Sequence, residues 1–154
     1  MSLGGDFYAL EQRHLAQILA GELDFFEFYE KTAAQDGPKA VFSEGEDAWH
    51  WLQLRFEALG LDILGVHETG LIPEAAFFSS ATEVQALAAA LGQLSEQQLS
   101  ALADLQDLAD ADFYHAEYWT EDAEPDEALM LLQALVAFYQ HCAAQGWALL
   151  YRMT

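Results

Sequence analysis

Basic residues are scarce in this sequence of 154 residues, which contains 5 Lys and Arg against 26 Asp and Glu. The formal net charge of −21 at pH 7 repels phosphate backbones and anionic lipid headgroups, which proteins bind through Lys and Arg. We therefore expect neither a nucleic-acid partner nor peripheral binding to a membrane. The imbalance is greatest between Arg55 and Arg152, where 16 acidic residues occur and no basic one.

Cysteine and long apolar runs are also lacking. Cys142 is the only cysteine, so an internal disulfide cannot form and nothing requires an oxidising compartment. No run approaches the ~20 apolar residues of a membrane span, because Asp, Glu, Gln or His interrupts each one. The N-terminal segment has no basic stretch followed by an apolar core, so we expect no signal peptide. Together these absences predict a cytoplasmic protein.

Apolar residues make up 53% of the chain and aromatic residues 13%, which is enough to build a folded core despite the charge. The length is that of one domain, and no repeat or low-complexity linker divides it. We therefore expect a single domain over residues 1–154.

Helix signals dominate the chain. Three pairs have the spacing of a capping box, in which a Ser and the residue three positions later satisfy each other's backbone donors: Ser43 with Glu46, Ser80 with Glu83, and Ser95 with Gln98. Apolar periodicity then predicts helices over residues 10–20 and 23–34, after each box, and from Pro125 to about Gly146.

Strand signals are few and short. Brief apolar or aromatic runs occur at residues 6–9, 39–43, 76–79 and 147–153. They are too sparse for alternating parallel units, so they favour an α+β fold: a helix-rich single domain with a small, mostly antiparallel sheet and helices segregated from it. An all-α bundle is the alternative.

The densest acidic region is residues 104–127, which we call the acidic segment. Its carboxylates are interleaved with aromatic residues, a mixture that suits a basic protein partner, because carboxylates steer the encounter and aromatics anchor it. The predicted partner-binding residues are Asp107, Asp110, Asp112, Tyr114, Glu117, Tyr118, Trp119, Glu121 and Asp122. The alternative is a solvated acidic loop whose aromatics, including Phe113, pack into the core.

Catalytic motifs are absent: the sequence has no Gly-rich phosphate loop, no nucleophile elbow and no paired cysteines. Glu46, Trp49 and His50 form a predicted polar site at a helix start, since residues four apart share a helix face. His50, or His115 with nearby carboxylates, could serve a small metal-assisted hydrolase, but no complete set of metal ligands is spaced for it. We therefore predict no catalytic residue, no metal and no cofactor.

Several stretches together carry a family likeness: residues 46–50 (EDAWH), residues 78–84 (FSSATEV), Tyr114 with Trp119, and residues 137–151. Their order resembles that of the YfbM-like family of bacterial proteins of unknown function. The resemblance implies an α+β fold, a bacterial origin and an association with immunity proteins beside secreted toxins. Glu46 stands where the family has Asp, and Gln53 where it has a second His. Glu74 and Phe77 replace a Gly and an Arg, so the resemblance transfers no catalytic residue.

The sequence thus favours a non-enzymatic acidic protein-binding module, for which one specific role is an immunity protein that neutralises a basic toxin. The small hydrolase using His50 or His115 is the alternative.

Overall fold

The computed structural model describes residues 4–44, 47–72, 75–108, 113–124 and 126–153. Its strands are β1 (Gly5–Leu10), β2 (Ala40–Ser43), β3 (His67–Thr69), β4 (Ala75–Ser79) and β5 (Ala148–Met153). Its α-helices are α1 (Gln12–Leu19), α2 (Phe25–Glu30), α3 (Trp49–Glu57), α4 (Ala81–Gly92), α5 (Glu96–Ala103) and α6 (Glu127–Gln145). Short 3₁₀ turns, η1 and η2, cover Ala33–Gln35 and Leu105–Leu108, and a π-helical turn, η3, covers Tyr118–Asp122.

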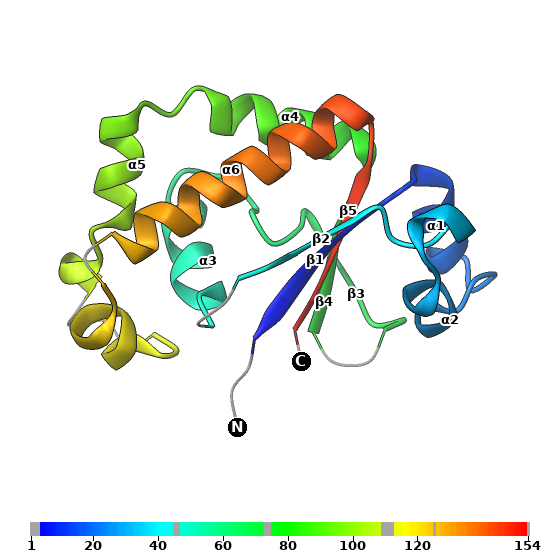
Figure 1. Ribbon diagram of the computed structural model, residues 1–154, viewed down its shortest axis with the longest axis horizontal. Coiled ribbons are helices and arrows are strands. Elements are labelled where there is room, and N and C mark those ends of the chain that lie inside the picture. Colours follow the sequence, from blue (N-terminus) through cyan, green and yellow to red (C-terminus); the bar gives the residue numbers. More distant parts are fainter. Residues whose placement is uncertain (1–3, 45–46, 73–74, 109–112, 125, 154) are drawn as a thin grey trace.

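The strands form one open sheet in the order β2-β1-β5-β4-β3, and every neighbouring pair is antiparallel. The central strand β5 therefore pairs with β1 on one side and β4 on the other, with Leu150 opposite both Tyr8 and Phe78. Figure 1 shows the start of β1 and the end of β5 side by side at one end of the sheet.

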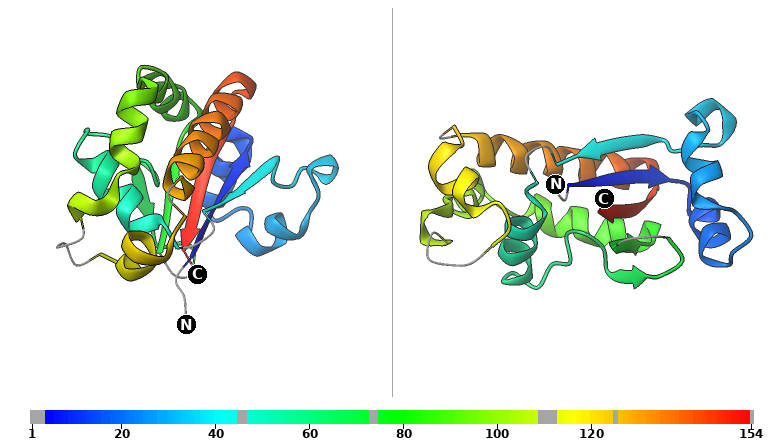
Figure 2. Two further views of the ribbon diagram at one scale, coloured as in Figure 1. Left: turned by 60° about the vertical axis from the view of Figure 1, so that its left-hand side comes forward. Right: turned by 90° about the horizontal axis from the view of Figure 1, so that it is seen from below.

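Helices cover both faces of this sheet (Figures 1 and 2). Alternation along β5 explains how one strand serves two cores, since successive side chains point to opposite faces. Leu149 and Tyr151 belong to the larger core with α3, α4 and α6, whereas Ala148 and Leu150 belong to the smaller core with α1 and α2. The predicted helix-rich α+β fold is confirmed, and the all-α alternative is wrong. The helices, however, are divided between the two faces.

The four predicted strands correspond to β1, β2, β4 and β5. Strand β3 was not predicted because its sequence, His-Glu-Thr, is short and polar, and its pairing with β4 is what makes it a strand. The predicted helix over residues 23–34 ends early, at Glu30, and a separate 3₁₀ turn follows.

Two of the three predicted capping boxes are confirmed. Ser80 Oγ accepts from the backbone N–H of Glu83 at 3.2 Å, and Glu83 Oε1 accepts from that of Ser80 at 2.8 Å; Ser95 and Gln98 make the same exchange. The box at Ser43 is wrong, because Ser43 lies in β2 and its hydroxyl donates to Asp6 on β1.

The structure defines where α3 begins and where α6 begins and ends. Helix α3 begins at Trp49, well after Ser43, and α6 begins at Glu127 rather than at Pro125, which lies outside the described residues. Gly146 ends α6 with φ +73°, a left-handed conformation that glycine adopts without steric penalty. The turn that it makes directs the chain from α6 straight into β5.

Within the described part of the chain, no helix is both long enough and apolar enough to cross a membrane.

Candidate functional site

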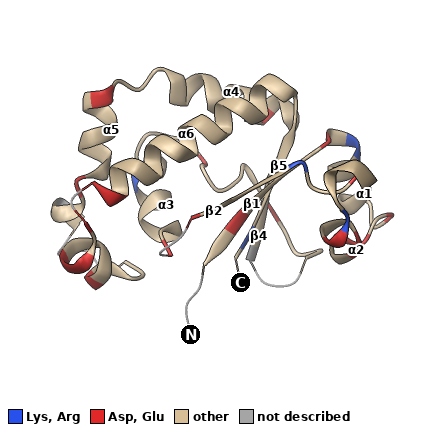
Figure 3. Cartoon of the chain, in the orientation of Figure 1, with Lys and Arg blue, Asp and Glu red and all other residues tan. Residues whose placement is uncertain are grey.

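The acidic segment forms one end of the molecule, remote from α1 and α2 (Figures 1 and 3). It runs from the end of α5 through η2 and η3 into the start of α6. Its described and exposed carboxylates are Asp104, Glu117, Glu121, Asp122, Glu124 and Asp126. The side chain of Asp107, and Asp110 and Asp112 entirely, lie outside the described residues. The predicted partner-binding carboxylates that are described are thus open to solvent.

The aromatic residues of this segment divide into two groups. Phe113 and Trp119 are 3% and 6% exposed, and the Trp119 ring packs edge-on against Trp51 with centroids 5.4 Å apart. Tyr114 and Tyr118 are half-buried, and the Tyr118 hydroxyl donates to the Glu127 carboxylate at 2.7 Å. This burial favours the alternative of core packing for Phe113 and Trp119. Trp119 therefore has little area of its own to offer as a projecting anchor.

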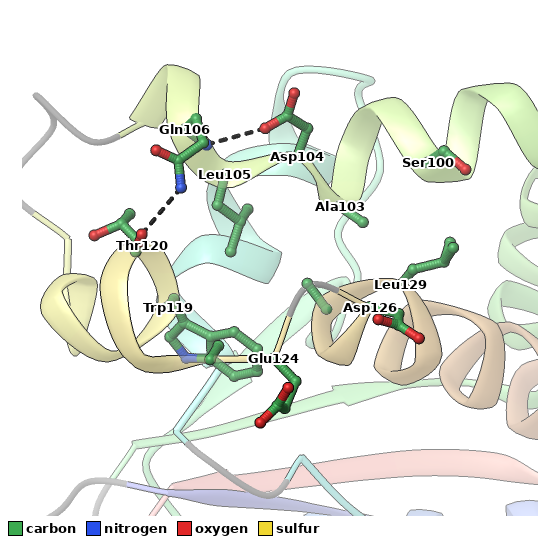
Figure 4. A pocket seen from close by; sticks show the side chains of 12 residues that line it. Ser100, Ala103, Asp104, Leu105, Gln106, Trp119, Thr120, Glu124, Asp126 and Leu129 are labelled. Atoms are coloured by element: carbon green, nitrogen blue, oxygen red, sulfur yellow. Dashed lines mark hydrogen bonds between the residues drawn. The ribbon is translucent and has the colours of Figure 1, made fainter.

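A cavity of about 500 Å³ opens between α5, η2, η3 and the start of α6 (Figure 4). Apolar walls are contributed by Ala103, Leu105, Trp119, Ala123, Ala128 and Leu129, and carboxylates by Asp104, Glu124 and Asp126. Gln106 Nε2 donates to the backbone oxygen of Thr120 at 3.0 Å, which ties η2 to η3 across one side of the opening. The cavity thus combines apolar surface with negative charge.

Arg55 fastens this region to α3. Its Nε donates to the backbone oxygen of Leu102 at 3.1 Å, and its Nη2 donates to that of Asp104. These bonds hold the end of α5, where the acidic segment begins, against the last turns of α3. The guanidinium therefore binds backbone carbonyl oxygens at the point where the acidic segment begins.

The predicted polar site is only partly brought together. Glu46 lies outside the described residues, whereas Trp49 and His50 begin α3 with their rings stacked, centroids 4.9 Å apart. His50 Nδ1 accepts from the backbone N–H of Tyr114 at 2.8 Å, and the Tyr114 ring stacks on Trp49. This hydrogen bond requires the Nδ1 lone pair, so His50 holds the segment around Tyr114 against α3.

His115 lies beside this contact. Its Nδ1 is 3.7 Å from Asp47 Oδ2, and its ring stacks on Tyr118. Asp47 and His115 both adopt left-handed backbones, with φ 56° and 63°, which is uncommon outside glycine. Among the described residues, no three or more His, Cys, Asp or Glu side chains are grouped so as to hold a metal ion.

Sequence reasoning missed the buried carboxyl of Glu44, which is 2% exposed. Tyr151 donates its hydroxyl to Glu44 Oε2 at 3.0 Å, while Oε1 has no hydrogen-bond partner within the described residues. The pKa of Glu44 is raised to about 8, mainly by burial and also by the nearby Asp47, although hydrogen bonds from Tyr151 and from backbone groups lower it in part. Strand alternation offered one signal, since Glu44 is two residues after Phe42, which packs on the same core.

The family model described as "Domain of unknown function (DUF1877)" matches residues 1–151. The chain belongs to this family. The structure is similar to the crystal structure of YfbM from Escherichia coli, a protein of unknown function, with a TM-score of 0.59 and 15% sequence identity over 98% of this chain and 99% of that chain. At this identity the similarity concerns the fold, and it confirms the resemblance to YfbM-like proteins. No curated protein matches the chain.

In this DUF1877 chain the two polar features differ in their access to solvent. Glu44 is 2% exposed, and its raised pKa of about 8 lets it hold a proton at neutral pH. The cavity of the acidic segment is open and lined by exposed carboxylates. The candidate functional site is therefore the acidic segment with its cavity.

Proposed function

We propose that this DUF1877 protein is a non-enzymatic binding module whose acidic segment holds a basic protein. In its most specific form, the partner is a secreted toxin that the chain neutralises as an immunity protein. The observation that carries the proposal is the exposure of six carboxylates within residues 104–127, in a stretch of sequence that has no Lys or Arg from residue 56 to residue 151.

Electrostatics supports a partner of opposite charge. Two like charges 4 Å apart repel by about 1 kcal/mol in water, and by more near a protein surface. A surface that places several carboxylates together therefore reduces the stability of the free fold, and a basic partner relieves that repulsion. The same field accelerates association, with rates that approach ~10⁸ M⁻¹s⁻¹ at low salt and fall as salt is added.

The proposal is tested by comparing two variants that lose equal charge. The first is Glu117→Gln/Glu121→Gln/Asp122→Asn in the acidic segment, and the control is Glu22→Gln/Glu27→Gln/Glu30→Gln around α2, where these side chains are also exposed. Each protein is immobilised and exposed to host extract at low salt, and the bound proteins are identified after a salt step.

A basic protein should be recovered by the unaltered chain and the control but lost from the acidic-segment variant. Association rates with the purified partner should then show the same order. Recovery of the same proteins by all three chains would contradict the proposal. For the immunity role, co-expression with a basic toxin encoded by a neighbouring gene should restore growth, and the acidic-segment variant should fail to do so.

A further inference from the structure

The cavity of the acidic segment points to a particular kind of contact, on the assumption that the proposed function holds. Half of its lining residues are apolar: Leu105 and Trp119 are almost fully buried, and Leu129 on α6 is half-buried. Figure 4 shows these side chains around the hollow, and the carboxylates of Glu124 and Asp126 beside it. A ligand for this cavity must offer both an apolar stem and a positive charge.

The three carboxylates of the cavity differ in whether they already accept a hydrogen bond within the described residues. Asp104 Oδ1 accepts from the backbone N–H of Gln106 at 3.2 Å, which fixes its orientation at the start of η2. Asp126 stands at the N-cap of α6, yet its side chain makes no capping hydrogen bond, so its oxygens remain available. Glu124 is exposed on the short connection between η3 and α6.

The net field at the cavity is negative. The start of α6 contributes a partial positive charge of about +0.5, which on its own would favour an anion. The three carboxylates of Asp104, Glu124 and Asp126 outweigh this partial charge, since each counts as a full formal negative charge. Three carboxylates line the cavity, whereas the one guanidinium beside it among the described residues, that of Arg55, is bound to the backbone oxygens of Leu102 and Asp104. Charge complementarity therefore selects a cation.

We infer that the cavity receives an arginine side chain of the basic partner protein. The planar guanidinium can present its forked donors to the exposed carboxylates of Glu124 and Asp126. The methylene stem packs on Ala103, Ala123 and Leu129, the apolar lining residues that are only half-buried. Lysine satisfies this arrangement less well, because its ammonium is a strongly hydrated point charge without the forked donors that match two carboxylates.

The inference is tested with two synthetic peptides of equal charge, hexaarginine amide and hexalysine amide, titrated by calorimetry at about 50 mM salt, where screening is weak. Two variants alter the cavity: Glu124→Gln/Asp126→Asn removes its free carboxylates, and Ala103→Leu adds apolar bulk inside it without changing charge. Glu22→Gln/Glu30→Gln at the opposite end is the control for lost charge. Circular dichroism of all variants establishes that they remain folded.

We expect the unaltered chain and the control to bind hexaarginine at least about fivefold more tightly than hexalysine, and both cavity variants to lose this preference. Equal affinity for the two peptides, or a preference that survives in Ala103→Leu, would overturn the inference while leaving the acidic segment as a general cation-binding surface. If neither peptide bound the unaltered chain, the proposed function would fail together with the inference.

Discussion

Replacing Glu44 by Gln should stabilise the protein at alkaline pH and change it little at acidic pH. Glu44 is 2% exposed, and burial raises its pKa from the ordinary value of 4.5 to about 8. Gln has nearly the same shape as the protonated carboxyl and can still accept a hydrogen bond from Tyr151. The substitution thus removes only the ability to ionise.

The sign follows from the protons bound in each state. Between pH 4.5 and about 8, the folded state retains a proton on Glu44 that the unfolded state has released. The free energy of unfolding therefore falls as pH rises through this window, by up to about 1.4 kcal/mol per pH unit. Over the whole window the penalty is on the order of 5 kcal/mol, a large share of the ~5–15 kcal/mol that stabilises a typical domain.

The measurement is urea unfolding followed by tryptophan fluorescence, at intervals from about pH 5 to pH 9. The difference between Glu44→Gln and the unaltered chain should grow steadily with pH and level off above about pH 8. Glu57→Gln on α3, an exposed position, removes the same charge and should give a difference that hardly varies with pH. A constant difference between Glu44→Gln and the unaltered chain across the range would refute the reasoning.

Three further outcomes follow from local geometry. Ser80→Ala removes the capping box of α4 and should lower the free energy of unfolding by about 1 kcal/mol. Ser100→Ala, at an exposed position within α5, should leave that free energy nearly unchanged. Equal effects of the two substitutions in urea unfolding would contradict this prediction. Cys142 is buried, which raises the pKa of its thiol to about 12. A thiol reagent such as DTNB should therefore label Cys142 only after unfolding. Rapid labelling of the native protein would contradict this prediction. Gly5→Ala would place a methyl group against the hydroxyl and ring of Tyr151 and should destabilise by about 1–3 kcal/mol. An unchanged melting temperature in Gly5→Ala would disprove the clash.

What the sequence predicted correctly depends on contacts between near neighbours. The boxes at Ser80 and Ser95 are satisfied within one turn, so their spacing was sufficient to place α4 and α5. The box at Ser43 failed because Ser43 pairs with Asp6, 37 residues away on the neighbouring strand, so no helix begins there. A local sequence pattern contains no information about a distant residue that only the pairing of strands brings close.

The candidate site was predictable in composition but not in arrangement. The run of carboxylates over residues 104–127 is visible in the sequence, whereas the burial of Trp119 depends on Trp51, which lies on a different helix. The cavity requires the packing of η2, η3 and α6 around a shared space. Glu44 is the extreme case, because its hydroxyl partner, Tyr151, is 107 residues away along the chain.

The position of β5 has a consequence for how the protein is made. This strand lies at the centre of the sheet, yet it is the last of the strands to be synthesised. At one end of its pairing with β1, Met153 lies opposite Gly5. While a ribosome is still extending the chain, β1 and β4 each lack the neighbour that separates them, and both cores lack the side chains that β5 contributes. Pairing between such distant segments is slow, and unpaired strand edges promote aggregation. A chain that is strongly negative along most of its length repels its unfinished copies during this interval, so the charge that suits a basic partner also protects the nascent protein.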